Sequence, residues 1–222
     1  MIPRHDQSSE SVYHRPMAAS PDVTVFILAG GQSTRMGRDK AFVEFNGHPL
    51  LTRALDLARS VASDVRIVGS KDKEKFAPYA PVVEDIFRDC GPLGGIHAAL
   101  RASPTDLNLM LAVDMPFVSS AFLQYLIDQA RIDQTRIGQA RTTADASVVV
   151  PRSGGLWQPL CAVYRRDFAD AAEAALRAGR NRIDVLFAAG KTRVIEEEEM
   201  ERAGFSRDLF RNLNTPEELE AE

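Results

Sequence analysis

The chain has 222 residues, of which 45% are hydrophobic and 26% charged, proportions ordinary for a soluble globular domain. Its net charge of −4 at pH 7 argues against a nucleic-acid partner, because general nucleic-acid binders need a broad basic face. No apolar run reaches the about 18 residues of a membrane span, and no secretory signal opens the chain, so we expect a cytoplasmic protein without a membrane partner. The two cysteines and four histidines show no metal-ligand spacing, which excludes a typical zinc site.

The chain begins with residues 1–21, which mix Ser, Pro, His and charged residues without periodicity and are expected to form a disordered leader. Residues 22–222 are expected to form a single domain. Apolar runs predict strands over residues 23–28, 65–68, 82–83, 107–113 and 147–150. Helical spacing appears between them, first from Leu50 to Ala58 and then from Phe122 to Ile127 after a possible cap at Ser119. This alternation predicts a mostly parallel sheet covered by helices on both faces.

The later part of the chain contains fewer strand signals. The polar segment 131–145 is expected to be a surface excursion. Residues 167–178 predict an alanine-rich helix closed by Gly179, and Thr215 is expected to cap a C-terminal helix. The acidic run 196–199 fits either a solvated face or the start of a helix.

A glycine turn follows the first strand directly. Gly30 and Gly31 allow backbone N–H groups to approach a phosphate, and the cations Arg35 and Lys40 lie within reach of the turn. The spacing matches neither a Walker loop nor the dinucleotide fingerprint. An ordinary strand-to-helix turn with solvated cations is the alternative, but the combination of glycines and cations favours a nucleoside triphosphate site.

The same stretch, from Leu28 to Ala41, reads L-A-G-G-x-S-x-R-M-G-x-D-K-A and resembles the opening motif of the molybdenum cofactor guanylyltransferases, the MobA family. The resemblance continues through G-P-L-G-G-I at 91–96, D-M-P at 114–116, Q-P-L-C-A-V-Y at 158–164 and N-L-N-T-P-E-E-L at 212–219, and so covers about residues 22 to 220.

The resemblance implies a Rossmann-like nucleotidyltransferase fold of three α/β/α layers. It implies an enzyme that transfers GMP from GTP to molybdopterin or the molybdenum cofactor, with an N-terminal half that binds the nucleotide and a C-terminal half that binds the pterin. It also implies Mg²⁺ as cofactor, and as protein partners other cofactor-biosynthesis proteins and the chaperones of molybdoenzymes. A phosphate monoester is largely ionised at neutral pH, so the acceptor needs positioning more than a general base.

Asp114 is the strongest candidate for a metal ligand. It emerges where the apolar strand 107–113 ends before Pro116, and Mg²⁺ prefers one or two carboxylates together with phosphate oxygens and water. A turn or cap aspartate is the alternative. The matching family residue binds Mg²⁺ and the nucleotide. The expected catalytic residues are Arg35, Lys40 and Asp114.

The remaining nucleotide contacts follow the glycine turn and the third strand. Asp85 matches the family's contact best, although Glu84 and Asp89 lie close to it. The family's asparagine after the second strand has no counterpart here, where Gly69 and Ser70 stand. The expected nucleotide-binding residues are Leu28, Ala29, Gly30, Gly31, Lys40, Asp85 and Asp114.

The pterin side of the site carries weaker signals. Asn181 and Arg182 occupy the position of a family stretch proposed to face the pterin, and Asn214 resembles the family's residue near the metal. Backbone satisfaction ahead of Thr215 is the alternative for Asn214. Trp157 fits either a wall for a flat pterin or the core.

Two other functions fit the same sequence. One is a related nucleotidyltransferase that uses CTP with molybdopterin or an NTP with a sugar phosphate. The other is a noncatalytic GTP-binding module that delivers the cofactor, which would bind GTP without forming a metal-dependent product.

Overall fold

The computed structural model describes residues 19–30, 39–69, 73–135, 146–189 and 191–211. The first half contains β1 (Ser20–Leu28), η2 (Lys40–Phe42), β2 (Glu44–Phe45), β3 (His48–Pro49), α1 (Leu50–Arg59), β4 (Ala62–Val68), α2 (Lys73–Phe76), β5 (Val82–Val83), α3 (Gly91–Ala102) and β6 (Leu107–Ala112). The second half contains α4 (Ser120–Thr135), β7 (Val148–Ser153), β8 (Leu156–Trp157), β9 (Cys161–Arg165), α5 (Phe168–Arg177), α6 (Asp184–Ala189), β10 (Thr192–Ile195), α7 (Glu197–Arg202) and η3 (Arg207–Phe210).

A central sheet with the strand order β10-β7-β9-β6-β1-β4-β5 organises the molecule, and β8 pairs with β7 at its side. The strands β6, β1, β4 and β5 are mutually parallel, and β10 is parallel to β7. Only β9 breaks the pattern within the main order, because it is antiparallel to both β6 and β7. The sheet is therefore mostly parallel, as the strand-helix alternation predicts.

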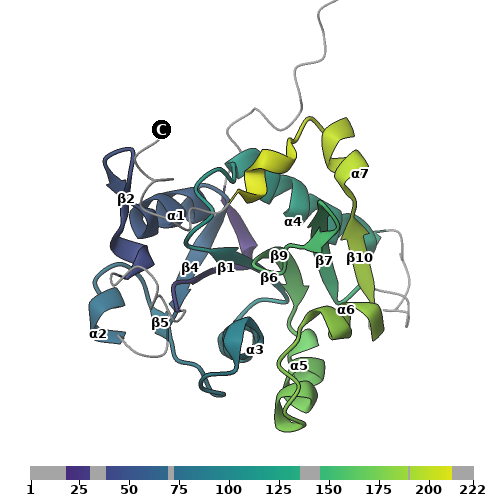
Figure 1. Ribbon diagram of the computed structural model, residues 1–222, viewed down its shortest axis with the longest axis horizontal. Helices are drawn as coiled ribbons and strands as arrows, with labels where there is room; N and C mark the ends of the chain where they lie inside the picture. The colour runs from purple at the N-terminus through teal and green to yellow at the C-terminus, as the bar shows by residue number, and fades with distance from the viewer. Residues whose placement is uncertain (1–18, 31–38, 70–72, 136–145, 190, 212–222) are drawn as a thin grey trace, which may run out of the picture.

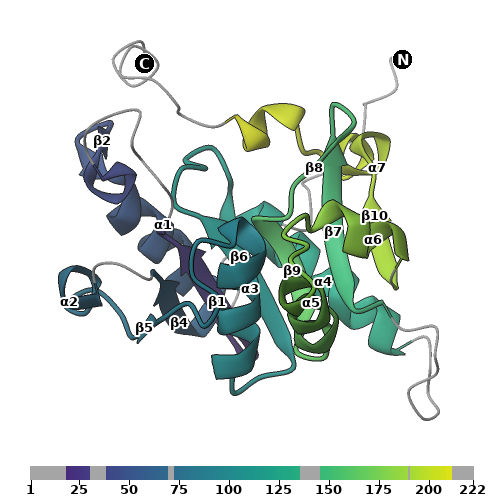
Figure 2. The same cartoon turned by 60° about the horizontal axis from the view of Figure 1, so that its bottom comes forward.

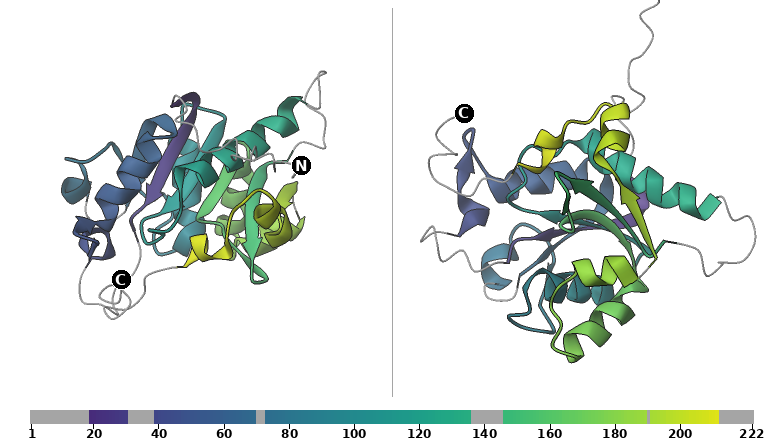
Figure 3. Two further views of the ribbon diagram at one scale, coloured as in Figure 1. Left: turned by 90° about the horizontal axis from the view of Figure 1, so that it is seen from above. Right: turned by 45° about the vertical axis from the view of Figure 1, so that its right-hand side comes forward.

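Helices cover both faces of this sheet (Figures 1 and 3). In β1, Val25 and Ile27 point into a core shared with α1 and α4, whereas Phe26 and Leu28 point into a second core shared with α3 and α5. Every residue from Val23 to Leu28 is buried, which explains why this strand reads as a continuous apolar run rather than an alternating one. The three-layer α/β/α fold is confirmed.

Local signals for three helix ends are also confirmed. The Ser119 Oγ accepts a hydrogen bond from the Phe122 N–H at 3.2 Å, which caps α4. Gly179 has a positive φ of 68° and follows α5, where the Arg180 N–H closes the helix end by donating to the Ala175 carbonyl at 2.9 Å. Glu196 is the residue before α7, so the acidic run 196–199 is the start of a helix.

The structure corrects two boundaries and adds two strands that the sequence did not predict. The strand β1 begins at Ser20, within the segment 1–21 expected to be disordered; residues 1–18 lie outside the described part of the chain. The helix α4 continues to Thr135 rather than ending before a surface excursion at Arg131, whose guanidinium pairs with Asp22 at 2.6 Å and with Asp128 at 3.6 Å. The strands β9 and β10 were missed because each is short, and its place depends on pairing partners distant in sequence.

Candidate active site

The carboxyl ends of three parallel strands meet at one edge of the sheet. Leu28, at the end of β1, lies in register with Val68 of β4 on one side and with Ala112 of β6 on the other. The segments that follow these strands therefore emerge side by side, and the Ala29 N–H donates to the Val68 carbonyl at 3.1 Å. Open α/β sheets place their ligands at this edge.

An ion pair at this edge joins Lys40 to Asp114. The Lys40 Nζ donates to the Asp114 Oδ2 at 3.1 Å, and their side chains are 23% and 22% exposed. Lys40 is held by the short helix η2, which the Asp39 carboxylate caps by accepting a hydrogen bond from the Ala41 N–H at 3.1 Å. Asp114 follows β6 directly. A cation from the glycine-rich segment and a carboxylate 74 positions later are thus brought together.

The second acidic position lies next to the N-terminal turns of α3. A Cβ atom added to Gly95 would stand 3.3 Å from the Leu28 Cδ2, 3.5 Å from the Val68 Cγ1 and 3.7 Å from the Asp85 Oδ1. The Asp85 carboxylate is therefore placed over Gly95, at the ends of β1 and β4. Of the three acids left open by the sequence, Asp85 lies beside Gly95 at this edge, whereas Glu84 pairs outward with Lys73 at 2.9 Å.

Gly94 makes the approach of this loop to α3 possible. A Cβ at Gly94 would lie 2.7 Å from the Phe87 carbonyl oxygen, closer than real Cβ contacts allow. Positions 94 and 95 of the G-P-L-G-G-I motif thus favour glycine for different steric reasons. Gly94 lets the loop backbone approach α3, and Gly95 leaves room beside the Asp85 carboxylate.

The MobA-like NTP transferase domain matches residues 25–194, which is most of the chain. The chain belongs to the MobA-like NTP transferase family. It is 32% identical over 196 residues to a probable molybdenum cofactor guanylyltransferase of Pelotomaculum thermopropionicum, covering 88% of this chain and 89% of that protein. It is 35% identical over 208 residues to the molybdenum cofactor guanylyltransferase of Pseudomonas aeruginosa, covering 92% of this chain and 96% of that protein.

A solved structure extends the likeness to three dimensions. The molybdopterin-guanine dinucleotide biosynthesis protein A of Archaeoglobus fulgidus superposes with a TM-score of 0.71 at 25% identity, covering 89% of this chain and 95% of that one. This member of the MobA-like family is therefore a nucleotidyltransferase with the fold of its relatives, and the resemblance read from the sequence is confirmed.

The expected residues of this MobA-like site other than Asn181 and Arg182 divide into two groups. Leu28, Ala29, Gly30, Lys40, Asp85 and Asp114 lie at or next to the carboxyl edge of the sheet. Gly31, Arg35 and Asn214 lie outside the described residues.

The two residues expected to face the pterin, Asn181 and Arg182, lie between α5 and α6. Asn181 is exposed, and the Arg182 guanidinium, whose side chain is 79% exposed, donates to both carboxylate oxygens of Asp184 at 3.2 and 2.5 Å. The hydrogen bonds from Arg182 lower the pKa of Asp184. Trp157 is half-buried and packs against Phe187, with a centroid separation of 5.3 Å, so its inner part belongs to the core on the α5 side of the sheet.

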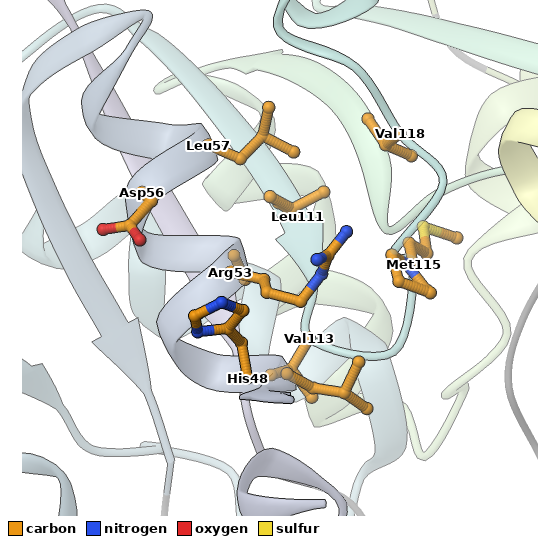
Figure 4. A pocket seen from close by; sticks show the side chains of 11 residues that line it. His48, Arg53, Asp56, Leu57, Leu111, Val113, Met115 and Val118 are labelled. Carbon is orange, nitrogen blue, oxygen red and sulfur yellow. The ribbon is translucent and has the colours of Figure 1, made fainter. Parts of the chain in front are cut away.

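A cavity of about 300 Å³ adjoins this site on the α1 side (Figure 4). Its walls come from α1 and from the segment after β6 that carries Asp114, and they are largely apolar. Arg53 reaches into it with a buried Nε that has no hydrogen-bond partner among the described residues. Sequence reasoning missed Arg53, because one arginine within a helical pattern carries no local signal.

Two further properties concern possible partners of the chain. In the part that the structure describes, no helix is both long and apolar enough to cross a membrane. Among the same residues, no group of three or more His, Cys, Asp or Glu side chains is arranged to hold a metal ion.

Proposed function

We propose that this enzyme transfers GMP from GTP to the terminal phosphate of molybdopterin or its molybdenum form and releases pyrophosphate. The product would be a guanine dinucleotide form of the cofactor. The single observation that best supports this function is the Lys40–Asp114 pair at the carboxyl edge of the sheet. The names of the relatives support the choice of nucleotide and acceptor.

The central difficulty of this reaction is the approach of two polyanions. Lys40 would contact the triphosphate, and the backbone of Leu28, Ala29, Gly30 and Gly31 would border it. Arg35 would stabilise the departing pyrophosphate. Cations and N–H groups that are in place before the reaction stabilise developing charge without reorganisation. This stabilisation is the main catalytic contribution of the protein in phosphoryl-type transfer.

The bond changes require no general base from the protein. An oxygen of the acceptor phosphate forms a bond to the α-phosphorus of GTP, while the bond from that phosphorus to the bridging oxygen of pyrophosphate breaks. The acceptor is a phosphate monoester with a second pKa of about 6, so it is mostly dianionic at pH 7. Asp85 would hold the nucleoside part of GTP beside Gly95, where its carboxylate lies.

Mg²⁺ is the proposed cofactor, and the donor set fits it. Asp114 offers a carboxylate that is 22% exposed at the end of β6, and magnesium is commonly held by one or two carboxylates while the substrate phosphates and water complete its shell. When bound, the ion would neutralise charge on the phosphates. Asp114 would hold it, and Lys40 would keep the carboxylate oriented.

The C-terminal half is proposed to receive the pterin. Asn181, Arg182 and Asn214 are its candidate contacts, and Trp157 offers a half-buried aromatic face that packs against Phe187 of α6. We place the enzyme in the cytoplasm, which suits the free thiols of Cys90 and Cys161. Exchange of the acceptor with other cofactor-biosynthesis proteins or with molybdoenzyme chaperones would suit a reactive cofactor.

The test is a product analysis. The full chain is incubated with Mg²⁺, the molybdenum-loaded pterin cofactor and GTP, CTP or ATP in separate reactions, and the nucleotide products are separated chromatographically. We expect a guanine dinucleotide and pyrophosphate with GTP alone. A cytosine dinucleotide would show that the enzyme is a cytidylyltransferase. GTP binding without any product would contradict the proposed acceptor.

A further inference from the structure

A charged cluster joins α3 to α5 on the face of the sheet opposite α1. The two helices lie side by side (Figure 2), and Glu173 of α5 is the centre of the cluster. Its Oε2 accepts from the Arg101 guanidinium at 2.6 Å and lies 3.4 Å from the His97 Nε2, while its Oε1 accepts from Arg177 at 2.9 and 2.7 Å. Hydrogen bonds from Arg177 and Arg101 lower the pKa of Glu173 to about 2.

His97 is an unusual member of this cluster for a purely structural role. Its side chain is 2% exposed, and its Nδ1 has no hydrogen-bond partner among the described residues. Arg101 already bridges the two helices by pairing with both Asp170 and Glu173. A buried polar atom without a partner costs stability, so an apolar residue at position 97 would serve helix packing better.

The cluster is in contact with the loop that carries Asp85. The Phe87 ring meets the His97 ring edge to face, with a centroid separation of 5.1 Å, and the Arg177 guanidinium lies 5.9 Å from the centre of the same Phe87 ring. Glu173 holds both of these partners. Phe87 is therefore fixed from two helices at once.

Phe87 also lies close to the carboxyl edge of the sheet, where nucleotide binding is proposed. It follows Asp85 by two positions, and its carbonyl oxygen sits against Gly94, where a Cβ would come within 2.7 Å. Asp85 itself lies over the next residue, Gly95. Asp85 and Phe87, two positions apart in the loop, thus lie against adjacent residues of α3.

We propose that His97 and Arg177, tied together by Glu173, are positioning residues that hold Phe87 and so keep Asp85 in place to receive the nucleotide. This inference rests on the proposed role of Asp85 in nucleotide binding. These three residues would act through the 84–90 loop, by way of the contacts of His97 and Arg177 with Phe87. Their loss should weaken binding of the nucleotide more than it slows the chemical step.

The first experiment measures steady-state kinetics of Phe87→Ala. We expect KM for GTP to rise about tenfold, since misplacement of a substrate contact by about 1 Å has large effects on complex formation, while kcat changes by less than about threefold. Arg177→Ala should raise KM by about two- to threefold, as suits a solvent-exposed cation–π contact. The matched control is Arg202→Ala on α7, which also removes an exposed arginine that bonds within its own helix; its KM should equal that of the wild type.

A double substitution separates positioning from helix packing. If Arg177 acts through the Phe87 ring, Arg177→Ala should add no further increase in KM once Phe87 is alanine. Glu173→Gln, which keeps an acceptor for the arginines, should raise KM less than Glu173→Ala does. Additive effects of the Phe87 and Arg177 substitutions, or a fall in kcat with KM unchanged, would overturn the proposal.

Hydrogen exchange tests the same proposal without turnover. The amides of residues 84–90 should exchange several-fold faster in Phe87→Ala and His97→Gln than in the wild type, while the amides of β6 and β9 should not change. This measurement needs no acceptor and no nucleotide. A wild-type enzyme that makes no guanine dinucleotide would refute the proposed function alone, whereas unchanged exchange of the 84–90 loop would refute the positioning role.

Discussion

The Lys40 ammonium and the Asp114 carboxylate lie 3.1 Å apart, although 74 positions separate them in the sequence. Each is fixed by a different element, η2 for Lys40 and the end of β6 for Asp114. Both side chains keep about a fifth of their surface exposed, so a phosphate and a metal ion have access to them. The pair thus links the cationic segment of the site to the carboxylate that is proposed to bind the metal ion.

Asp114→Asn tests the metal assignment. The substitution keeps the size of the side chain and removes its charge, so turnover at ordinary Mg²⁺ should fall by about 10²- to 10³-fold if the carboxylate holds the ion. The measurement is pyrophosphate release with GTP and the loaded acceptor. The control is Asp128→Asn on α4, whose carboxylate accepts from Gln124 at 2.9 Å and pairs with Arg131 of the same helix at 3.6 Å. Turnover near the wild-type value in Asp114→Asn would exclude Asp114 as the metal ligand.

Lys40→Ala separates catalysis from stability. A partly exposed ion pair contributes about 0–1 kcal/mol, so the free energy of unfolding should change little. In contrast, kcat should fall by about 10²-fold if the ammonium stabilises charge that develops on the phosphates. Urea denaturation and steady-state kinetics measure the two quantities. Lys191→Ala, at an exposed position before β10, serves as the control. A large loss of stability with unchanged kcat would show that Lys40 is structural.

Gly94→Ala tests the contact between α3 and the Asp85 loop. The added Cβ would stand 2.7 Å from the Phe87 carbonyl oxygen, which is backbone and must move. We expect a loss of about 1–3 kcal/mol in the free energy of unfolding, together with a higher KM for GTP. Gly69→Ala is the comparison, because its Cβ would meet only the Phe76 ring at 3.2 Å, and a side chain yields more easily. Equal losses in the two variants would contradict a specific backbone clash.

Much of the fold was predictable because its signals are local. The buried run 23–28, the Ser119 cap and the Gly179 helix end each depend on neighbouring residues and are confirmed. The strands β9 and β10 were not predictable in this way, since each depends on pairing with a strand that is distant in the sequence. The end of α4 was missed for a related reason. The helix includes Arg131, whose guanidinium pairs with Asp22, a residue 109 positions away in the sequence.

The candidate site shows the same limit. The motif resemblance named Lys40, Asp85 and Asp114, and the topology brings their segments to one edge, but the roles of these residues remain predictions. Arg53 and His97 belong to no motif. Their positions, a buried Nε beside the cavity and a buried ring against Phe87, arise only when α1 and α3 pack on opposite faces of the sheet.

The pH dependence of stability provides a last test, centred on His97. Burial is the largest cause that lowers the pKa of this imidazole below 6.5; Glu173 opposes the shift, and Arg101 and Arg177 add to it. The folded state therefore binds a proton less readily than the unfolded state, so stability is lost as the pH falls from 6.5 toward the folded pKa. The lowered pKa of Glu173 acts in the same direction, but only between 4.5 and about 2.

Of His97 and Glu173, only His97 thus changes its protonation between pH 7.5 and 5.5. We expect the free energy of unfolding of the wild type, measured by urea denaturation, to fall more over this range than that of His97→Gln, which cannot be protonated. The exposed His48 provides the control, and His48→Gln should follow the wild type. If His97→Gln loses as much stability as the wild type, the acid sensitivity does not come from the buried imidazole, because the variant retains every other titrating group of the cluster.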